Sequence, residues 1–288
     1  MNLILSILFI FFVFLIGIIP FRILYFVSDF LRLFLSGVLA YRKKVISNNL
    51  KKALPNLDKK EEDRLIRLIY KNLTDVIVEG LKSFTMTKRQ INKRHKIINP
   101  EILTPYFEQG KSIIAVAGHY ANWEWGSLSA SLQTDYNVVA LYKPLSNKWV
   151  DKFMRWTRTR SGTELASIYE TGKTFDKCEG TNTIFLMAAD QSPTNKKKSY
   201  WLNFFDIETA FLHGPEKYAQ KYNYPVLYVD VQREKRGIYT VSLSVFADNP
   251  SELKDGEITK MYANKLESII KKQPENWLWS HRRWKLSR

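Results

Sequence analysis

With 288 residues, the chain is long enough to bury a full core, and one large domain with an anchor is the simplest division. Its 44 basic and 28 acidic residues give a net charge of +16. Nucleic acid, an anionic membrane surface or an acidic protein partner would each explain that charge, as would a solvated basic surface. The single cysteine, Cys178, excludes an intrachain disulfide framework.

The first forty residues are dominated by apolar side chains. Leu3 to Ile19 is interrupted only by Ser6 and Gly17. As a helix it would be about 25 Å long, slightly short of a hydrocarbon core of about 30 Å. We expect it to anchor the chain, either by crossing a locally thinned bilayer or by lying deep in one leaflet. A cleaved signal peptide is disfavoured, because no basic residue precedes the run and no small-x-small site follows it closely. The length of the apolar run disfavours a buried core helix.

A second apolar stretch and a group of basic residues follow the anchor. Ile23 to Leu39 carries only Asp29 and Arg32 as charged residues and predicts a helix that lies along the bilayer surface. The sequence divides into residues 1–40, an anchor with an interfacial helix, and residues 41–288, a single domain. By the positive-inside rule, the basic residues after the run place that domain in the cytoplasm: Arg22, Arg32, Arg42, Lys43 and Lys44.

Residues 41–288 carry the pattern of an α/β domain. Lys59 to Phe84 has apolar residues at helical spacing behind Asp58, a suitable N-cap, and predicts a helix packed on a sheet. Short apolar runs predict strands at Ile113–Ala117, Val138–Leu141, Ile184–Ala188, Val226–Val231 and Tyr239–Val245. Further helices are predicted at Lys148–Arg160, Gly214–Lys221 and Ile258–Lys272. This alternation favours an α/β fold with a mixed, largely parallel sheet flanked by helices, in which the last two strands pair antiparallel through Arg233–Gly237.

A histidine and a carboxylate stand five positions apart where the first predicted strand ends. His119 follows Gly118, and Asn122 is a suitable N-cap for a helix that begins at Trp123 and contains Glu124. A histidine in the loop can therefore meet a glutamate in the first turn of the helix. A carboxylate that accepts from one ring nitrogen fixes the imidazole tautomer, so the other nitrogen can act as a general base. Chance proximity is the alternative, but open α/β sheets place their sites at such strand ends.

Residues 118–124, Gly-His-Tyr-Ala-Asn-Trp-Glu, resemble the His-x4-Glu motif of the late acyltransferases of lipid A synthesis. That family belongs to the wider glycerolipid acyltransferase group. Further blocks resemble the family in the same order, at residues 141–162, 189–209 and 274–285. Lys143 stands where the family commonly has Arg, and Asp206 stands where it has a small residue.

The resemblance implies a membrane-associated O-acyltransferase of the bacterial inner membrane, with its catalytic domain on the cytoplasmic face. Such an enzyme would move a fatty acyl chain from the thioester of acyl carrier protein to a hydroxyl of a lipid A precursor. His119 would take the hydroxyl proton, while Glu124 would orient His119 and compensate its charge. No acyl-enzyme nucleophile is needed, since the chain has no Gly-x-Ser-x-Gly elbow and Cys178 has no base beside it in the sequence.

The oxyanion of the reaction needs donors, and backbone N–H groups after Gly118 and a cation are the physical candidates. By resemblance, Arg160 is the first candidate for the cation, with Arg158 and Lys143 as alternates. Each of the three could instead be an exposed basic residue.

Asp190 ends its predicted strand as His119 ends its own, so in a parallel sheet the two would face the same crevice. Asp190 could bind the acceptor, hold Arg160 in place or cap the end of its strand. Gln191 and Asn122 complete the candidate substrate-binding residues.

The closing segment, residues 277–285, is rich in Trp and Arg. It suits a membrane interface with phosphate head groups or stacking on single-stranded nucleic acid, and packing of the tryptophans on the core is an equal alternative. The anchor favours the membrane over nucleic acid, so we expect no nucleic-acid partner. We also expect no metal site and no cofactor, since the chain has four histidines and lacks His-Glu-x-x-His and Cys-x2-Cys patterns.

Two other functions stay open at this point. The chain could acylate a different lipid acceptor, such as an aminolipid, a glycolipid or a lysophospholipid. It could also be a non-catalytic, membrane-tethered basic protein that binds lipid or nucleic acid, although such a protein has no use for the His119 and Glu124 pair.

Overall fold

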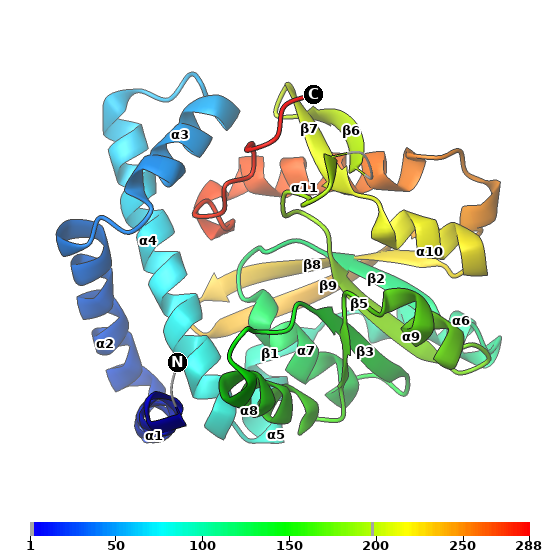
Figure 1. Ribbon diagram of the computed structural model, residues 1–288, viewed down its shortest axis with the longest axis horizontal. Coiled ribbons are helices and arrows are strands. Elements are labelled where there is room, and N and C mark those ends of the chain that lie inside the picture. Colours follow the sequence, from blue (N-terminus) through cyan, green and yellow to red (C-terminus); the bar gives the residue numbers. More distant parts are fainter. Residues whose placement is uncertain (1–2, 197–198) are drawn as a thin grey trace.

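A seven-stranded sheet forms the centre of the molecule (Figure 1). The computed structural model describes residues 3–196 and 199–288. The strand order is β1-β9-β8-β2-β5-β3-β4, and neighbours run parallel except for the antiparallel hairpin of β8 and β9. The prediction of a mixed, largely parallel sheet is confirmed. The strands are β1 (His95–Ile97), β2 (Ile113–Ala117), β3 (Asn137–Tyr142), β4 (Glu164–Ser167), β5 (Thr183–Ala188), β8 (Val226–Lys235) and β9 (Ile238–Ala247).

The central strands are apolar along their length because helices lie on both sides of the sheet. Figure 1 shows α10 (Gly214–Tyr222) and α11 (Glu257–Lys272) on one side, with α5 (Lys88–Arg94), α7 (Gly126–Ser129) and α8 (Lys148–Thr159) on the other. Residues 113–116 of β2 are all buried between them. All the predicted strands are present, and the predicted antiparallel pairing of the last two is confirmed. Gly237 closes that hairpin with a φ of +70°, in the left-handed region that glycine adopts without strain.

The longest helix of the domain, α4, spans 24 residues from Lys59 to Lys82 and lies between α2 (Phe21–Leu33) and the sheet (Figure 1). Asp58 caps it as predicted, since its carboxylate accepts a hydrogen bond from the Glu61 N–H at 2.7 Å. Leu65, Ile69 and Val76 form its buried apolar stripe. The domain also contains the helices α3 (Lys43–Ala53), α6 (Thr104–Glu108) and α9 (Thr171–Lys177) and the hairpin of β6 (Ser199–Phe204) and β7 (Ile207–Leu212).

The N-terminal segment folds as α1 (Leu3–Ile18) and α2 (Phe21–Leu33), followed by a π-helical turn at Phe34–Val38. Both predicted helices are present. α1 is fastened to the domain, because the Thr85 hydroxyl donates to the Gly17 carbonyl at 2.5 Å and Phe14 packs on Phe153 of α8 with ring centroids 6.1 Å apart. The opposite face of α1 carries exposed apolar side chains, among them Ile4, Phe11 and Ile18.

Within the described residues, no single helix is long and apolar enough to cross a membrane. The bent pair formed by residues 21–38 and 43–53, whose axes differ by 87°, has the length and composition to do so.

Candidate active site

His119 and Asp190 follow the carboxyl ends of two neighbouring parallel strands. Ala117 at the end of β2 and Ala188 at the end of β5 are register partners, and His119 and Asp190 each lie two residues further on. Adjacent parallel strands deliver their carboxyl ends to the same edge of the sheet. The expectation that these two residues meet is confirmed.

The carboxylate of Asp190 holds His119 at two points. Its Oδ1 lies 2.5 Å from Nδ1 of the imidazole, and its Oδ2 accepts the backbone N–H of His119 at 2.8 Å. Nε1 of Trp277 donates to the same Oδ2 at 2.9 Å. Because the carboxylate binds at Nδ1, the ring proton belongs there and Nε2 keeps its lone pair. Asp190 is only 2% exposed and His119 is 18% exposed, so the carboxylate is sealed while the imidazole is partly open.

The charges around the imidazole of His119 raise its pKa. Burial alone would lower the pKa of His119, but the charge of Asp190, their hydrogen bond and the charge of Glu124 outweigh it and raise the pKa above the usual histidine value. Burial alone would likewise raise the pKa of Asp190, but the contacts with His119 and Trp277 lower it. Asp190 is therefore ionised, and it stabilises the imidazolium that forms when Nε2 takes a proton.

Glu124 has a different partner from the one expected. Its carboxylate binds Nη2 of Arg158 at 2.5 Å, and the carboxylate that binds the His119 ring is that of Asp190. Glu124 lies in a short 3-10 helix, Trp123–Trp125, that continues into α7. The expectation that Glu124 orients His119 was therefore wrong, because Asp190 from the neighbouring strand occupies Nδ1. Glu124 was also expected to compensate the charge of His119, and this agrees with the structure, since the charge of Glu124 raises the pKa of His119.

The three basic candidates lie in three different environments. Arg158 is placed by α8 beside Glu124. The guanidinium of Arg160 donates to the carbonyls of Ser83, at 3.0 Å, and Met86, and burial lowers its pKa. Lys143 is exposed just beyond β3, and no hydrogen bond or ion pair between described residues joins it to the site.

Two expected roles are changed by these contacts. Asp190 does not hold Arg160, since the two bind separate partners. Asn122 is fully buried, and its side chain is used within the protein: Oδ1 caps the 3-10 helix by accepting the Trp125 N–H at 3.1 Å, and Nδ2 donates to Glu79 at 2.6 Å. Asn122 is thus an N-cap, as predicted, and is sealed from substrate. Gln191 lies at the open side, where its amide donates to Nε2 of His119 at 3.2 Å.

The Trp-rich closing segment packs on the core and contacts both Asp190 and His119. Trp277 and Trp279 are buried, and the Leu278 N–H donates to the carbonyl of His119 at 3.1 Å. Nε2 of His281 accepts the Ser192 N–H at 2.9 Å, and burial lowers the pKa of His281 to about 4. Of the alternatives left open for this segment, packing on the core is the one that the structure has. The hydrogen bond from Trp277 to Asp190 could not be predicted from the sequence. The only signal was the resemblance of residues 274–285 to a block of the family.

Neither a cysteine nucleophile nor a metal site is found near the imidazole among the described residues. Cys178 is buried, and burial raises the pKa of its thiol, which disfavours the reactive thiolate. Among the described residues, no three His, Cys, Asp or Glu side chains gather as a metal site would require. The chemistry of the site rests on its imidazole.

A histidine held by a buried aspartate at the carboxyl edge of an α/β sheet is the arrangement that an enzyme with general base catalysis requires. The sequence model of the bacterial lipid A biosynthesis acyltransferase family matches residues 2–286, and the chain belongs to this family. Over 248 residues it is 23% identical to the lipid A biosynthesis lauroyltransferase of Escherichia coli (strain K12), an alignment that covers 85% of this chain and 79% of that protein. The chain is an acyltransferase.

Proposed function

We propose that this acyltransferase moves a fatty acyl chain from acyl carrier protein to a hydroxyl of a lipid A precursor, at the cytoplasmic face of the bacterial inner membrane. Family membership supports the acceptor class. The observation that carries the chemistry is the bond between Asp190 Oδ1 and His119 Nδ1, which leaves Nε2 as a base at the open edge of the sheet.

The proposed step is a direct transfer. Nε2 of His119 takes the proton of the acceptor hydroxyl while the oxygen attacks the thioester carbonyl. The tetrahedral intermediate collapses as the C–S bond breaks, and the imidazolium returns the proton to the leaving thiolate. The amide of Gln191, 3.2 Å from Nε2, marks the position that the acceptor hydroxyl would take. Asp190 keeps the tautomer and stabilises the imidazolium, so no covalent acyl-enzyme is required.

We assign the Arg158 and Glu124 pair to the electrostatics of the same step. Both side chains are partly exposed, at 22% and 31%, as a group that meets substrate must be. Arg158 takes the place of Arg160 as the proposed cation for the oxyanion, because Arg160 is committed to the carbonyls of Ser83 and Met86. Glu124 orients Arg158 and compensates the imidazolium charge. Lys143 and Asn122 have no role in this proposal.

Exposed apolar side chains support attachment to a lipid surface. They occur on α1, on α2 and on α8, which packs against α1 through Phe14 and Phe153. Exposed apolar side chains that gather on one surface typically mark a site of contact with a membrane or another protein. Representative members are Phe11, Ile18, Phe26, Phe30, Trp149 and Trp156.

The donor is assigned from charge. Acyl carrier proteins as a class are small and acidic, and this chain has a net charge of +16. Lys148, Lys152 and Arg155 are exposed along α8, the helix that also carries Arg158. Opposite charges steer the encounter of two proteins, and a basic face along α8 that ends at Arg155, one helix turn from Arg158, would deliver the thioester to the site.

A lipid profile tests the proposal. Mass spectrometry of lipids from cells that contain the wild-type protein should show lipid A carrying one more acyl chain than lipid A from cells without it. Cells with the His119→Ala variant at equal abundance are the matched control and should resemble the cells without the protein. An added acyl chain on an aminolipid, glycolipid or lysophospholipid, with lipid A unchanged, would overturn the acceptor assignment.

A further inference from the structure

Glu79 is a carboxylate buried in the middle of α4, with no exposed surface. Burying a carboxylate is strongly unfavourable unless hydrogen bonds replace the lost water. Its Oε1 accepts from the hydroxyl of Tyr25 at 2.7 Å, and its Oε2 accepts from Asn122 Nδ2 at 2.6 Å and from the hydroxyl of Tyr239 at 2.7 Å. These donors come from α2, from the turn after His119 and from β9. The carboxylate therefore ties three parts of the fold to α4.

Two of the contacts of Glu79 fix the turn between His119 and Glu124. Its carboxylate holds Asn122, whose Oδ1 caps the Trp125 N–H. Its backbone carbonyl accepts the indole N–H of Trp125 at 3.1 Å. Between His119 and Asn122, Ala121 has a φ of +51°, in the left-handed region that non-glycine residues adopt only when their surroundings impose it. Glu79 is part of what imposes this conformation.

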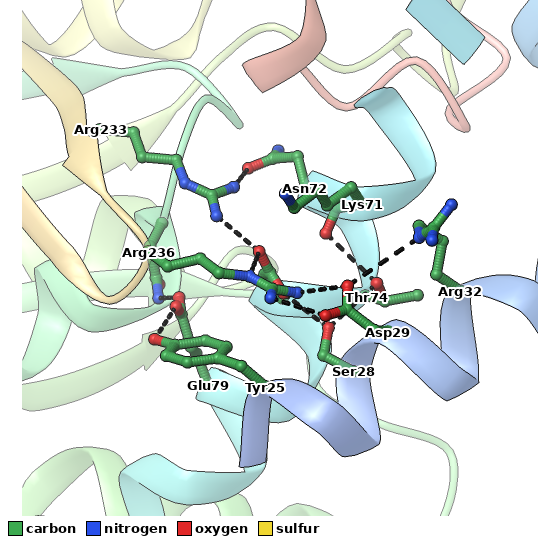
Figure 2. A network of polar contacts seen from close by, with 12 residues as sticks. Tyr25, Ser28, Asp29, Arg32, Lys71, Asn72, Thr74, Glu79, Arg233 and Arg236 are labelled. Carbon is green, nitrogen blue, oxygen red and sulfur yellow. Dashed lines mark hydrogen bonds and ion pairs between the residues drawn. The ribbon is translucent and has the colours of Figure 1, made fainter. Parts of the chain in front are cut away.

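The other end of the connection is α2. Tyr25 lies on the side of α2 that faces α4, while Phe26 and Phe30 are 75% and 73% exposed. Figure 2 shows polar groups that fasten the inner side of α2, among them Asp29 of α2 beside Arg236. The guanidinium of Arg236 binds Asp29 at 2.8 Å and also binds Asp75 of α4 at 2.7 Å. The Ser28 hydroxyl donates to Asp75 at 2.6 Å. The position of α2 relative to α4 is therefore specified by buried and partly buried polar contacts.

We propose that Glu79 is a positioning residue for acyl transfer, which links α2 through Tyr25 to Asn122 and thereby to the turn that carries His119 and Glu124. This inference rests on the proposed function, in which the apolar face of α2 lies on lipid and the turn performs the chemistry. Glu79 touches no substrate and acts through Asn122. The connection runs Tyr25, Glu79, Asn122, and each link is a hydrogen bond of 2.6–2.7 Å.

A matched pair of variants separates positioning from mere stability. Tyr25→Phe and Tyr239→Phe each remove one hydroxyl that donates to Glu79 and keep the ring. Both should lower the melting temperature by a similar amount, about 2–4 °C for one hydrogen bond in a domain of this size. Only Tyr25→Phe breaks the bond between α2 and Glu79. It should lower kcat about tenfold with KM for the acyl donor unchanged, while Tyr239→Phe should leave kcat close to wild type.

Glu79→Gln and Glu79→Ala complete the series. The glutamine can accept from Asn122 and Tyr239 with its oxygen and donate to the Tyr25 hydroxyl with its amide, so it should keep most of the kcat. The alanine variant should lose most of the kcat. If that variant does not fold, the two tyrosine variants and the glutamine variant still test the positioning role of Glu79. Equal losses of kcat in Tyr25→Phe and Tyr239→Phe, or an unchanged kcat in Tyr25→Phe, would overturn the proposal.

Hydrogen exchange gives a readout that needs no acceptor lipid. Backbone amides of residues 119–126 should exchange faster in Tyr25→Phe than in Tyr239→Phe, because the first variant loosens the turn. Identical exchange in both would overturn the inference even if acyl transfer is confirmed. Faster exchange in Tyr25→Phe, together with a wild-type protein that transfers no acyl chain to lipid A, would support the positioning role and refute the proposed function.

Discussion

Oδ1 of Asp190 lies 2.5 Å from Nδ1 of His119, although 71 residues separate them in the chain. The parallel register of β2 and β5, in which Ala117 faces Ala188, brings them together. Trp277 from the closing segment donates a hydrogen bond to the same carboxylate. The imidazole is therefore oriented by a residue from the neighbouring strand, while Glu79 holds the turn that follows it.

Replacing Asp190 by Asn should shift the pH dependence of transfer. The charge of Asp190 raises the pKa of His119, and the base works only when it is deprotonated, so wild-type activity should rise with pH through a value above about 6.5, the usual histidine pKa. Without that charge, burial lowers the pKa, and the acidic limb of the kcat/KM profile should move to lower pH. The maximal kcat should fall by about 10²–10⁴-fold, since the imidazolium loses its stabilising partner.

A control for that shift is Trp277→Phe. It removes one hydrogen bond to Asp190 and leaves the carboxylate charge. Its acidic limb should stay close to that of the wild type. An acidic limb in Asp190→Asn that coincides with the wild-type limb would contradict the assignment of His119 as the titrating base.

Glu124 and Arg158 should behave as one unit. Glu124→Ala and Arg158→Ala should each lower kcat, by about 10² or more, because each leaves the other charge misplaced beside the site. The double variant should be little worse than either single variant. Steady-state kinetics on all four proteins measures the coupling, with thermal unfolding as a check on folding. Losses that multiply in the double variant would mean that the 2.5 Å pair has no joint role.

The parts of the fold that follow from local pattern could be predicted, and those that depend on distant contacts could not. β2 is five consecutive apolar residues after Lys111 and Ser112, and its predicted bounds match the structure. β1, by contrast, is only His95–Ile97, with an exposed Lys96 in its middle, and carries no apolar run. It forms because β9 offers it an edge to pair with.

The same distinction applies to the site. His119 and the capping role of Asn122 could be predicted, because a strand end and an N-cap are local features. The partner of the imidazole could not, because Glu124 is near in sequence and Asp190 is near only through the strand order. Glu79 shows no signal in the sequence beyond a carboxylate on a helix, and its role depends on contacts from α2, β9 and the turn.

Deleting residues 1–21 should release much of the protein from membranes and leave a salt-sensitive remainder held by the basic surface. Electrostatic attraction is screened over about 8 Å at physiological salt, whereas apolar insertion is not. Flotation with anionic liposomes at low and high salt measures both fractions. Persistent binding of the shortened chain at high salt would make α2 or α8 the principal anchor.

Because the deletion also uncovers Phe153 of α8, a second variant is needed. Ile7→Asp combined with Phe11→Asp changes only exposed side chains of α1 and keeps its packed face. This double variant should show the same release with an unchanged melting temperature.

The donor assignment predicts competition. Acyl carrier protein without an acyl chain should inhibit transfer, and reversing charges at Lys148, Lys152 and Arg155 should relieve that inhibition and slow the use of acyl carrier protein. Inhibition constants at several salt concentrations give the test. Trp149, on the same helix, is 53% exposed, so liposome binding of the reversed variant must be measured alongside. If free carrier protein has no effect while acyl-coenzyme A is used efficiently, the donor is the coenzyme A thioester.

The most direct test of the account is the single-turnover rate of the His119→Ala variant. Purified variant and wild type are mixed with labelled acyl carrier protein thioester and a lipid A precursor in detergent, and the formation of the acylated lipid is followed in time. Without the base at Nε2, the rate should fall by about 10²–10⁴-fold, while the melting temperature and liposome binding stay close to wild type. A His119→Ala protein that is folded, bound to liposomes and as fast as the wild type would contradict the central role of this histidine.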